Sequence, residues 1–264
     1  MSEGRILATT LGHVRVISID RPRARNALTP DMLDAIAEAI GAAGAEASLR
    51  AVLIRGHAET PFSAGYDLGA LPDERRLTEA DARELQRPIR ELCTRLRECP
   101  HPVIGAVRRY AIGAALDVLA HCDLRVAETG ARFSLPAARV GVAYPLEGVT
   151  NLAAAMGPSR AARLLLLAEE HSAEELAGSG FLHRVFPEGG FEAGIETLAG
   201  DLDRLAPLAL RGLKRALVCA GADRPPEAEV AALYRALAET LDSADGREGP
   251  SALREKRPPR FRGA

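Results

Sequence analysis

The sequence predicts an α/β protein whose strands pair largely in parallel. Short apolar runs rich in β-branched residues alternate with longer helical segments up to about residue 146, the pattern of strands joined by helical crossovers. Beyond that point the strand signals nearly vanish, and only residues 181–187 still read as extended. With 264 residues, 47% of them hydrophobic, the chain is long enough for one large core plus a helical extension. We therefore expect a core over residues 1–200 and a helical C-terminal region and tail over residues 201–264.

Most of the expected strands lie in the first half of the chain. The runs ILATT and VRVISID flank a Leu-Gly-His turn at residues 11–13, which indicates a β-hairpin. Thr29 is expected as the N-cap, and Pro30 as the first residue, of a helix that runs to about Ala43. Further strands are expected at residues 51–56, 102–107 and 123–128, and a further helix at residues 81–98.

The last third of the chain is expected to be helical. Helices are expected at residues 157–170, 172–180, 194–206 and 207–221, before the basic, Pro-rich tail EKRPPRFRGA. Residues 208–221 are amphipathic, so their apolar face is expected to pack either within the subunit or against a neighbouring one.

Composition excludes several classes of protein. The net charge is −2, aromatic residues make up 4% of the chain and there is no Trp, whereas nucleic-acid-binding proteins usually show basic stripes with stacking aromatics. We expect no secretory signal, because the first ten residues have neither a basic region nor a long apolar one, and no uncharged apolar run approaches the roughly 18 residues that span a bilayer. The four cysteines lack C-x-x-C spacing, which favours buried free thiols in a reducing compartment. We expect a cytoplasmic protein that binds neither nucleic acid nor membrane.

Motifs for the commonest cofactors and nucleophiles are also missing from the sequence. It contains no H-E-x-x-H, no G-x-G-x-x-G and no Walker A motif, and the GSG at residues 178–180 is not a nucleophile elbow. The six histidines form no cluster with metal-ligand spacing. No metal is expected.

Two turns of small residues carry the candidate chemistry. FSAGYDL, residues 62–68, follows the strand expected at 51–56, and YAIGAALD, residues 110–117, follows the strand expected at 102–107 and leads into a short helix. Gly and Ala let a ligand approach the main chain, and the first N–H groups of a helix have no intrahelical partner. Two such turns that converge would hold one oxygen between two N–H donors, as an oxyanion hole does.

These turns resemble motifs of one known family. FSAGYDL, the long segment from HPVIGAV to RVGV at residues 101–142, and RNAL at residues 25–28 are similar to those of the crotonase, or enoyl-CoA hydratase/isomerase, superfamily. The resemblance runs from about residue 12 to about residue 220 and extends to the closing EKRPPRF. It implies a crotonase-like spiral of ββα units and an acyl-CoA substrate, with coenzyme A as part of the substrate and no separate cofactor. It also implies a homotrimer or a dimer of trimers.

The resemblance assigns roles to particular residues. The backbone N–H of Tyr66 would be the first oxyanion donor and that of Ala114 the second, where the family usually has Gly. Arg21, Arg23 and Arg25 would either meet the phosphates of coenzyme A or lie in a solvated loop. The residues implied to line the substrate path are Arg25, Ala27, Ala64, Gly65, Asp67, Leu68, Ile112, Gly113, Pro136, Ala137 and Tyr144, with Phe261 reaching the adenine of a neighbouring subunit.

Asp117 is the candidate catalytic carboxylate. It lies three residues beyond Ala114, on nearly the same helical face, where the family often carries a catalytic Glu. An ionised carboxylate in a bare core is costly, so the alternatives are a solvent-facing position or a structural pair with a buried Arg.

The chain departs from the hydratase pattern after Pro136. Hydration in the family uses two glutamates around one water, and Ala137 stands where the second is expected. Isomerisation, which one base can carry out, is therefore favoured over standard hydration. Glu147 is the candidate helper, although it would equally suit the dipole of a helix that begins near Pro145. Tyr144 would either touch substrate or pack as a core aromatic.

Two other functions stay open. A degenerate relative would bind acyl-CoA without turning it over, and a serine hydrolase on the same scaffold is a distant third. The length of the acyl pocket would depend on the loop at residues 69–84.

Overall fold

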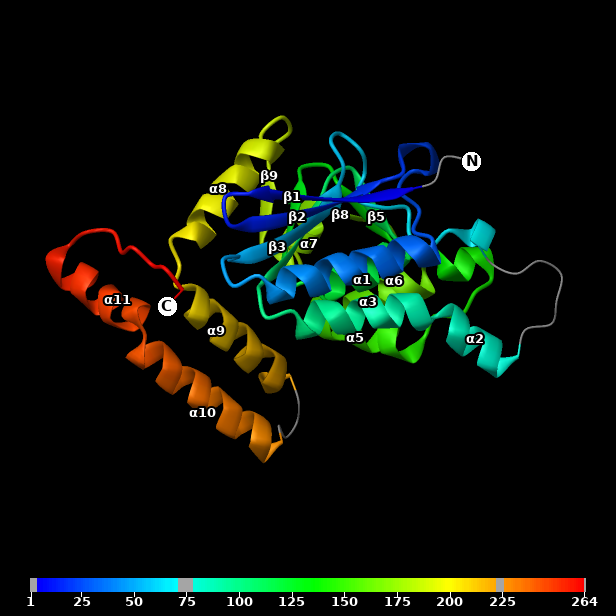
Figure 1. Ribbon diagram of the computed structural model, residues 1–264. Coiled ribbons are helices and arrows are strands. Elements are labelled where there is room, and N and C mark those ends of the chain that lie inside the picture. The colour runs from blue at the N-terminus through cyan, green and yellow to red at the C-terminus, as the bar shows by residue number, and fades with distance from the viewer. Residues whose placement is uncertain (1–3, 71–77, 222–225, 264) are drawn as a thin grey trace.

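A six-stranded sheet forms the centre of the molecule. The computed structural model describes residues 4–70, 78–221 and 226–263 (Figure 1). The strands lie in the order β1-β2-β3-β4-β6-β9. Their bounds are β1 Arg5–Leu11, β2 Val14–Asp20, β3 Ala51–Gly56, β4 Val103–Val107, β6 Leu124–Glu128 and β9 Arg184–Phe186. Strands β1 and β2 form an antiparallel hairpin, and every later pairing in this sheet is parallel, so the predicted α/β class and hairpin are confirmed.

The central strands are buried on both faces. In β3, Val52 and Ile54 belong to the main hydrophobic core, whereas Ala51 and Leu53 belong to a second, smaller core on the opposite face. Successive side chains of a strand point to opposite faces. A continuous apolar run such as AVLI therefore marks a strand that is covered on both sides.

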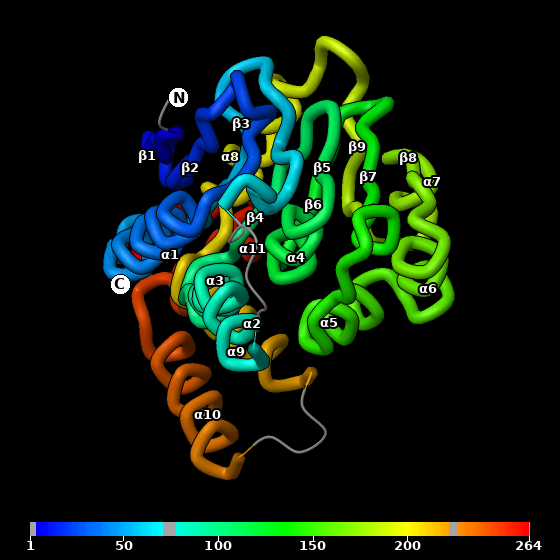
Figure 2. Tube along the Cα trace, turned by 90° about the vertical axis from the view of Figure 1, so that its right-hand side faces the viewer, coloured from blue at the N-terminus to red at the C-terminus, as the bar shows by residue number. Residues whose placement is uncertain are grey.

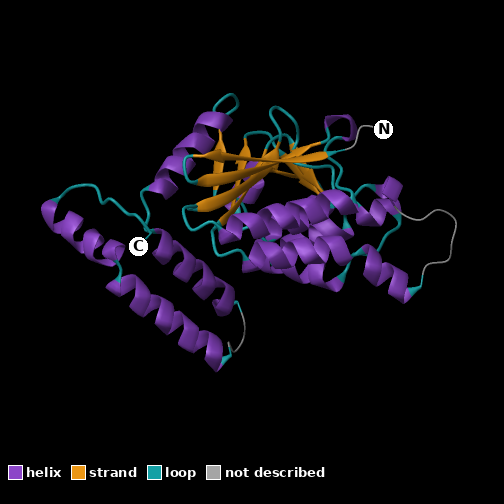
Figure 3. Ribbon diagram, viewed as in Figure 1, coloured by secondary structure: helices purple, strands orange, loops and turns teal. Residues whose placement is uncertain are grey.

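Helices cover both faces of the sheet (Figure 3). On one face lies α8, whose apolar residues join β3, β4 and β6 in the smaller core. On the other face lie α1 and α3, and α4 lies between α3 and α5 (Figure 2). The bounds of the core helices are α1 Pro30–Ala45, α2 Glu79–Leu85, α3 Arg87–Glu98, α4 Ala114–Ala120, α5 Leu146–Met156, α6 Pro158–Leu166, α7 Ala173–Gly178 and α8 Phe191–Asp203.

The helix expected at residues 81–98 is two helices. The first, α2, begins with a capping box between Thr78 and Asp81, and α3 begins at Arg87 with Pro88 in its first turn. Proline has no N–H to donate to the carbonyl four residues earlier, so it disrupts the interior of a helix but is well tolerated in the first turn of a new one. The helical spacing of apolar residues continues almost unchanged across this break. The sequence pattern therefore does not reveal that there are two helices.

A small second sheet lies beside the first and orients the segment that leads into α4. It contains β5 Tyr110–Ile112, β7 Arg132–Ser134 and β8 His171–Ser172 in the order β5-β7-β8. Strand β5 follows β4 directly and pairs in parallel with β7. The chain thus leaves the large sheet at the end of β4, joins the small sheet for three residues and then enters α4.

The C-terminal third is helical, as predicted. It consists of α9 Pro207–Ala220, α10 Glu227–Asp242 and α11 Ala244–Glu255, which project from the body of the molecule (Figure 1). Lys214 attaches α9 to the core. Its side chain is 4% exposed, and its ammonium group donates to the carbonyls of Leu96 and His101 at 3.0 Å and lies 2.8 Å from the Asp123 carboxylate.

Candidate active site

The first small-residue turn is held in place by Asn26. The Asn26 side chain is fully buried; its amide donates to Thr60 Oγ1 and to the Pro61 carbonyl, and its oxygen accepts from the Arg21 N–H. Its backbone carbonyl accepts from the Ser63 hydroxyl, which in turn accepts from the Gly65 N–H. Asn26 has a φ of +57°, a left-handed conformation that Asn tolerates better than most residues.

The same turn lies between two neighbouring segments. On one side Leu28 donates to the Gly65 carbonyl and accepts from the Asp67 N–H. On the other side, Ser63 pairs with Ala111 of β5. Leu28 and Tyr66 face each other in a parallel bridge. Because both hydrogen bonds of this bridge are made by Leu28 with the neighbours of Tyr66, the Tyr66 N–H points away from Leu28.

The second turn meets the first at Gly65 and Gly113. Gly113 has φ +57° and ψ −125°, which strongly favours glycine, and its N–H donates to the Ser134 carbonyl at 2.9 Å. A Cβ built on Gly65 would lie 2.5 Å from the Ile112 carbonyl oxygen and 3.3 Å from the Ala114 nitrogen. The two turns predicted from the sequence are therefore in direct contact. Among the described residues, neither the Tyr66 nor the Ala114 N–H has an acceptor.

Asp117 is buried one helical turn beyond Ala114. Its side chain is 7% exposed, so the solvent-facing alternative is wrong. No ion-pair partner occurs among the described residues, which removes the alternative of an arginine pair within that part of the chain. Oδ2 accepts a hydrogen bond from the Tyr144 hydroxyl, whereas Oδ1 is buried without a partner in the described structure.

Gly148 makes room for this pair. It lies in the first turn of α5, and a Cβ built on it would lie 2.6 Å from Cε1 of Tyr144 and 2.9 Å from Oδ1 of Asp117. Real Cβ atoms are essentially never found this close to other heavy atoms. The sequence showed this glycine, but nothing in the pattern distinguished it from an ordinary helical glycine.

Burial controls the electrostatics of the pair. It raises the pKa of Asp117 to about 6, and the hydrogen bond from Tyr144 opposes that rise. Burial and the Asp117 charge together raise the pKa of Tyr144 well above its usual value. At neutral pH the aspartate is therefore mostly ionised while the phenol keeps its proton.

Of the remaining candidate residues, Ala137 is partly buried and Glu147 is exposed. Ala137 begins a short 3-10 helix, packs partly buried against the main core, and follows Pro136 as predicted. Glu147 lies in the first turn of α5, as predicted, with an exposed side chain that makes no hydrogen bond in the described structure. The structure thus pairs Asp117 with Tyr144 and not with Glu147.

The residues implied for the coenzyme A path lie around the first turn. Arg21 donates to the Ala27 carbonyl at 3.1 Å and to Asp67 at 2.6 Å, so its charge is already compensated by Asp67. Arg25 and Leu68 are exposed. Phe261 lies against Gly249, and its carbonyl accepts from Arg50 at 3.4 Å.

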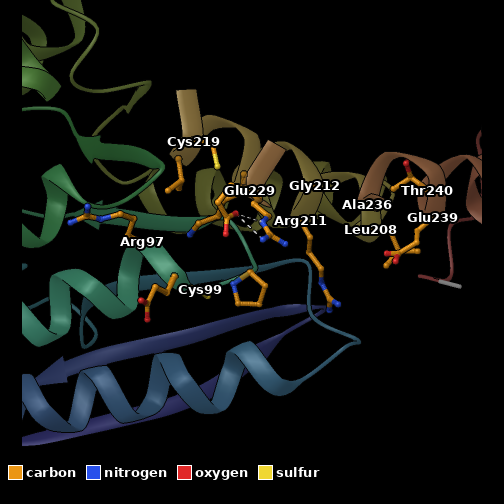
Figure 4. A pocket seen from close by; sticks show the side chains of 15 residues that line it. Arg97, Cys99, Leu208, Arg211, Gly212, Cys219, Glu229, Ala236, Glu239 and Thr240 are labelled. Atoms are coloured by element: carbon orange, nitrogen blue, oxygen red, sulfur yellow. Dashed lines mark hydrogen bonds and ion pairs between the residues drawn. The ribbon is translucent and has the colours of Figure 1, made fainter. Parts of the chain in front are cut away.

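A cavity of about 230 Å³ opens beside Tyr66. It is lined by the start of α1 and by α2 and α3, including Pro30, Leu85 and Arg87. Of the loop expected to set the pocket length, residues 71–77 lie outside the described residues. A larger cavity of about 620 Å³ lies elsewhere, between the end of α3 and helices α9 and α10 (Figure 4). An ion pair between Arg215 and Glu229 joins the two helices there, and the cavity has none of the predicted site residues in its wall.

The described residues contain neither a metal-binding cluster nor a membrane-spanning helix. No described group of three or more His, Cys, Asp and Glu side chains is arranged to hold a metal ion. In the same part of the chain, no helix combines the length and apolarity that a membrane crossing requires. All four cysteines are free, and three of them are buried.

Sequence reasoning missed Asn26 as well as Gly148. RNAL was noted as a family motif, but the buried contacts of Asn26 depend on Thr60 and Pro61, which lie more than 30 residues away. An asparagine that follows an Arg-rich segment is the only signal that the sequence offered.

Comparison with known proteins identifies the family. The family model described as enoyl-CoA hydratase/isomerase matches residues 9–264. A "Probable enoyl-CoA hydratase echA6" of Mycobacterium tuberculosis is 34% identical over 255 residues, covering 95% of this chain and 96% of that protein. The 2,3-dehydroadipyl-CoA hydratase of Escherichia coli is 32% identical over the full length of both chains. The chain therefore belongs to the enoyl-CoA hydratase/isomerase family.

Solved structures agree with that assignment. The crystal structure of an enoyl-CoA hydratase/carnithine racemase from Magnetospirillum magneticum has a TM-score of 0.91 and 28% identity, covering 100% of this chain and 97% of the other. Another enoyl-CoA hydratase, from Polaromonas, has a TM-score of 0.87 and 29% identity, covering 97% of this chain and 99% of the other. The crotonase-like fold expected from the resemblance is confirmed, with its helical C-terminal region.

Proposed function

We propose that this family member moves a double bond within an acyl-CoA thioester through an enolate held by the backbone amides of Tyr66 and Ala114. Asp117 removes a proton from the α-carbon of the thioester and returns it to the γ-carbon of the same acyl chain. The observation that carries the proposal is the contact between the two turns, with a buried carboxylate one helical turn beyond Ala114. Losing one such amide typically costs about 3 kcal/mol of transition-state stabilisation.

Isomerisation is preferred to hydration because this chain supplies one buried carboxylate at the site. Ala137 presents a methyl group where the hydratase pattern has its second glutamate, and a methyl group neither orients water nor transfers a proton. Glu147 is exposed on α5. A single base that carries one proton between two carbons needs no second carboxylate.

A substrate panel with one matched variant tests this proposal. Purified protein is assayed with 2-enoyl-CoA and 3-enoyl-CoA thioesters, and products are separated by mass. Asp117→Asn should lower kcat for isomerisation by about 10²–10⁴-fold, the usual contribution of a positioned acid or base. Asp242→Asn, at an aspartate whose side chain is 96% exposed, should leave turnover unchanged. Unaltered turnover in Asp117→Asn would exclude Asp117 from the mechanism.

The second candidate is an acyl-CoA-binding protein without turnover, favoured by Ala137 alone. Calorimetry with the same thioesters, followed by long incubation and mass spectrometry, separates the two functions. Tight binding with no product supports the second candidate, and any reproducible product that depends on Asp117 supports the first.

We also propose that the chain assembles as a trimer or a pair of trimers. Large apolar side chains are exposed along the C-terminal helices, among them Leu213 and Leu217 of α9 and Leu237 and Leu241 of α10. Such faces are commonly covered by a second subunit. In such an assembly Phe261 would be close enough to a neighbouring subunit to reach its bound adenine.

A further inference from the structure

We infer that Tyr144 is a positioning residue for Asp117: its hydroxyl fixes one carboxylate oxygen and keeps the group ionised for proton transfer. The inference rests on the proposed acyl-CoA function and adds a role for Tyr144 on the aspartate instead of on the substrate. It also explains how a single carboxylate operates without the second one of the hydratase pattern.

The two oxygens of Asp117 have different surroundings. Oδ2 accepts from the Tyr144 hydroxyl, whose residue precedes α5 and stands 27 positions further along the chain. Oδ1 has less than 1 Å² of exposed surface and no partner in the described structure. An unpartnered oxygen in a low-dielectric interior is costly to a folded protein, so the hydrogen bond from Tyr144 to Oδ2 is the contact that stabilises this carboxylate in the described structure.

Among the described residues, the Asp117 carboxylate has no polar partner besides Tyr144. The α3 residue facing Asp117 is Cys93, whose thiol stays protonated because burial raises its pKa. On α4 itself, the His121 ring nitrogen Nδ1 contacts the backbone carbonyl of Asp117 at 2.8 Å and not its carboxylate. Burial and the nearby Arg97 lower the pKa of that imidazole, so no described cation faces the carboxylate directly.

A neutral phenol suits this role. Because the pKa of Tyr144 is raised well above its usual value, the hydroxyl keeps its proton throughout and acts only as a donor. A donor to a carboxylate favours the charged form and so lowers the pKa of the acid. Tyr144 therefore offsets part of the rise that burial imposes on Asp117.

The proton inventory is simple. The α-C–H bond of a 3-enoyl thioester breaks, its proton forms an O–H bond on Asp117, and its electron pair passes into the dienolate, with negative charge on the thioester oxygen. The same O–H bond then breaks as a C–H bond forms at the γ-carbon. Nothing is oxidised or reduced, and the Tyr144 proton does not leave its oxygen.

Helix α5 can pack closely against Tyr144 and Asp117 because residue 148 is a glycine. Any side chain at this position would contact both the Tyr144 ring and Oδ1 of Asp117. Gly41, in the exposed part of α1, has nothing within 4 Å of the place a Cβ would occupy, and it serves as the matched control for adding a methyl group to a helix.

The pH dependence of kcat/KM tests the inference. In the wild-type protein kcat/KM for isomerisation should rise with pH through a midpoint near 6, where Asp117 ionises. Tyr144→Phe should move that midpoint up by about one pH unit, the size of a lost hydrogen bond to a charged group. Gly148→Ala should move it in the same direction. Tyr234→Phe, at an exposed tyrosine of α10, and Gly41→Ala should leave it in place.

A direct readout separates failure of the inference from failure of the proposed function. The infrared C=O band of protonated Asp117 is identified by its loss in Asp117→Asn and titrated in the wild type and in Tyr144→Phe. An upward shift of the midpoint in Tyr144→Phe supports the pairing even if no thioester is turned over, in which case only the proposed function fails. An unchanged midpoint in this titration, or in the kinetic profile, overturns the inference.

Discussion

At Asp117, the proposed catalytic use and the stability of the fold oppose each other. Burial raises its pKa to about 6 from a usual value of 3.8, so between these values the folded chain holds a proton that the unfolded chain has lost. Because the folded state then binds more protons, the free energy of unfolding falls as pH rises from about 4 to about 6. The fold is therefore less stable when Asp117 is ionised, which is the state that the proposed reaction needs.

Asp117→Asn should consequently stabilise the fold at neutral pH. A raised pKa of this size corresponds to about 1–3 kcal/mol at pH 7, and the gain should disappear below about pH 4. Urea unfolding at several pH values measures the difference between wild type and variant. His101, whose burial lowers its pKa to about 4, titrates in both proteins, so its contribution cancels.

Asp242→Asn is the control for the stability experiment, because its side chain is solvated. It should change the free energy of unfolding by no more than about 0.5 kcal/mol at any pH. If Asp117→Asn changed the free energy of unfolding at pH 7 as little as Asp242→Asn does, a raised pKa at Asp117 would be contradicted.

At the scale of elements, the site depends on short segments that belong to no long helix or strand. Asn26 joins the loop after β2 to the loop after β3 through Thr60 and Pro61, and Ser63 joins the latter to β5 through the bridge with Ala111. Local propensity predicted the flanking strands correctly. It gave no sign of these contacts, because each of them joins residues far apart in the chain.

Asn26→Ala should therefore weaken both the fold and ligand binding. It removes buried hydrogen bonds and places Ala at a φ of +57°, which together should lower the free energy of unfolding by about 2–4 kcal/mol. Asn151→Ala, at a half-buried asparagine of α5 with no side-chain hydrogen bond in the described structure, is the control. Urea unfolding and acyl-CoA titration calorimetry are the measurements, and equal effects of the two variants would contradict the role of Asn26.

At the scale of the whole molecule, the C-terminal helices differ from the core in what they bury. The core strands are covered on both faces, but Leu217 is 70% exposed on α9 and Leu241 is 69% exposed on α10. Lys214 fixes α9 against the body, so the exposed apolar face is held in a defined orientation. A rigid apolar face favours association with a matching surface.

Leu217→Glu should lower the sedimentation coefficient toward that of a monomer, because it introduces a charge into the proposed contact. The control is Ala193→Glu, at an exposed position of α8 on the other side of the sheet, which should sediment like the wild type. Sedimentation velocity at micromolar concentration measures both. A wild-type protein that sediments only as a monomer would contradict the proposed assembly.

The sequence by itself determined the α/β class, the strands of the six-stranded sheet but not the three short strands of the second sheet, and the two small-residue turns with Asp117 beyond the second. Those features follow from local periodicity, turn chemistry and the order of motifs, which are written along the chain. Only the tertiary structure decided which groups meet: Gly65 with Ala114, Asn26 with Thr60 and Pro61, and Tyr144 with Asp117. Tyr144 and Glu147 are three residues apart and looked equally available, but the start of α5 places the phenol inside against the carboxylate and leaves the glutamate in solvent. The direction in which a helix begins is set by packing against α4, and no local pattern encodes it.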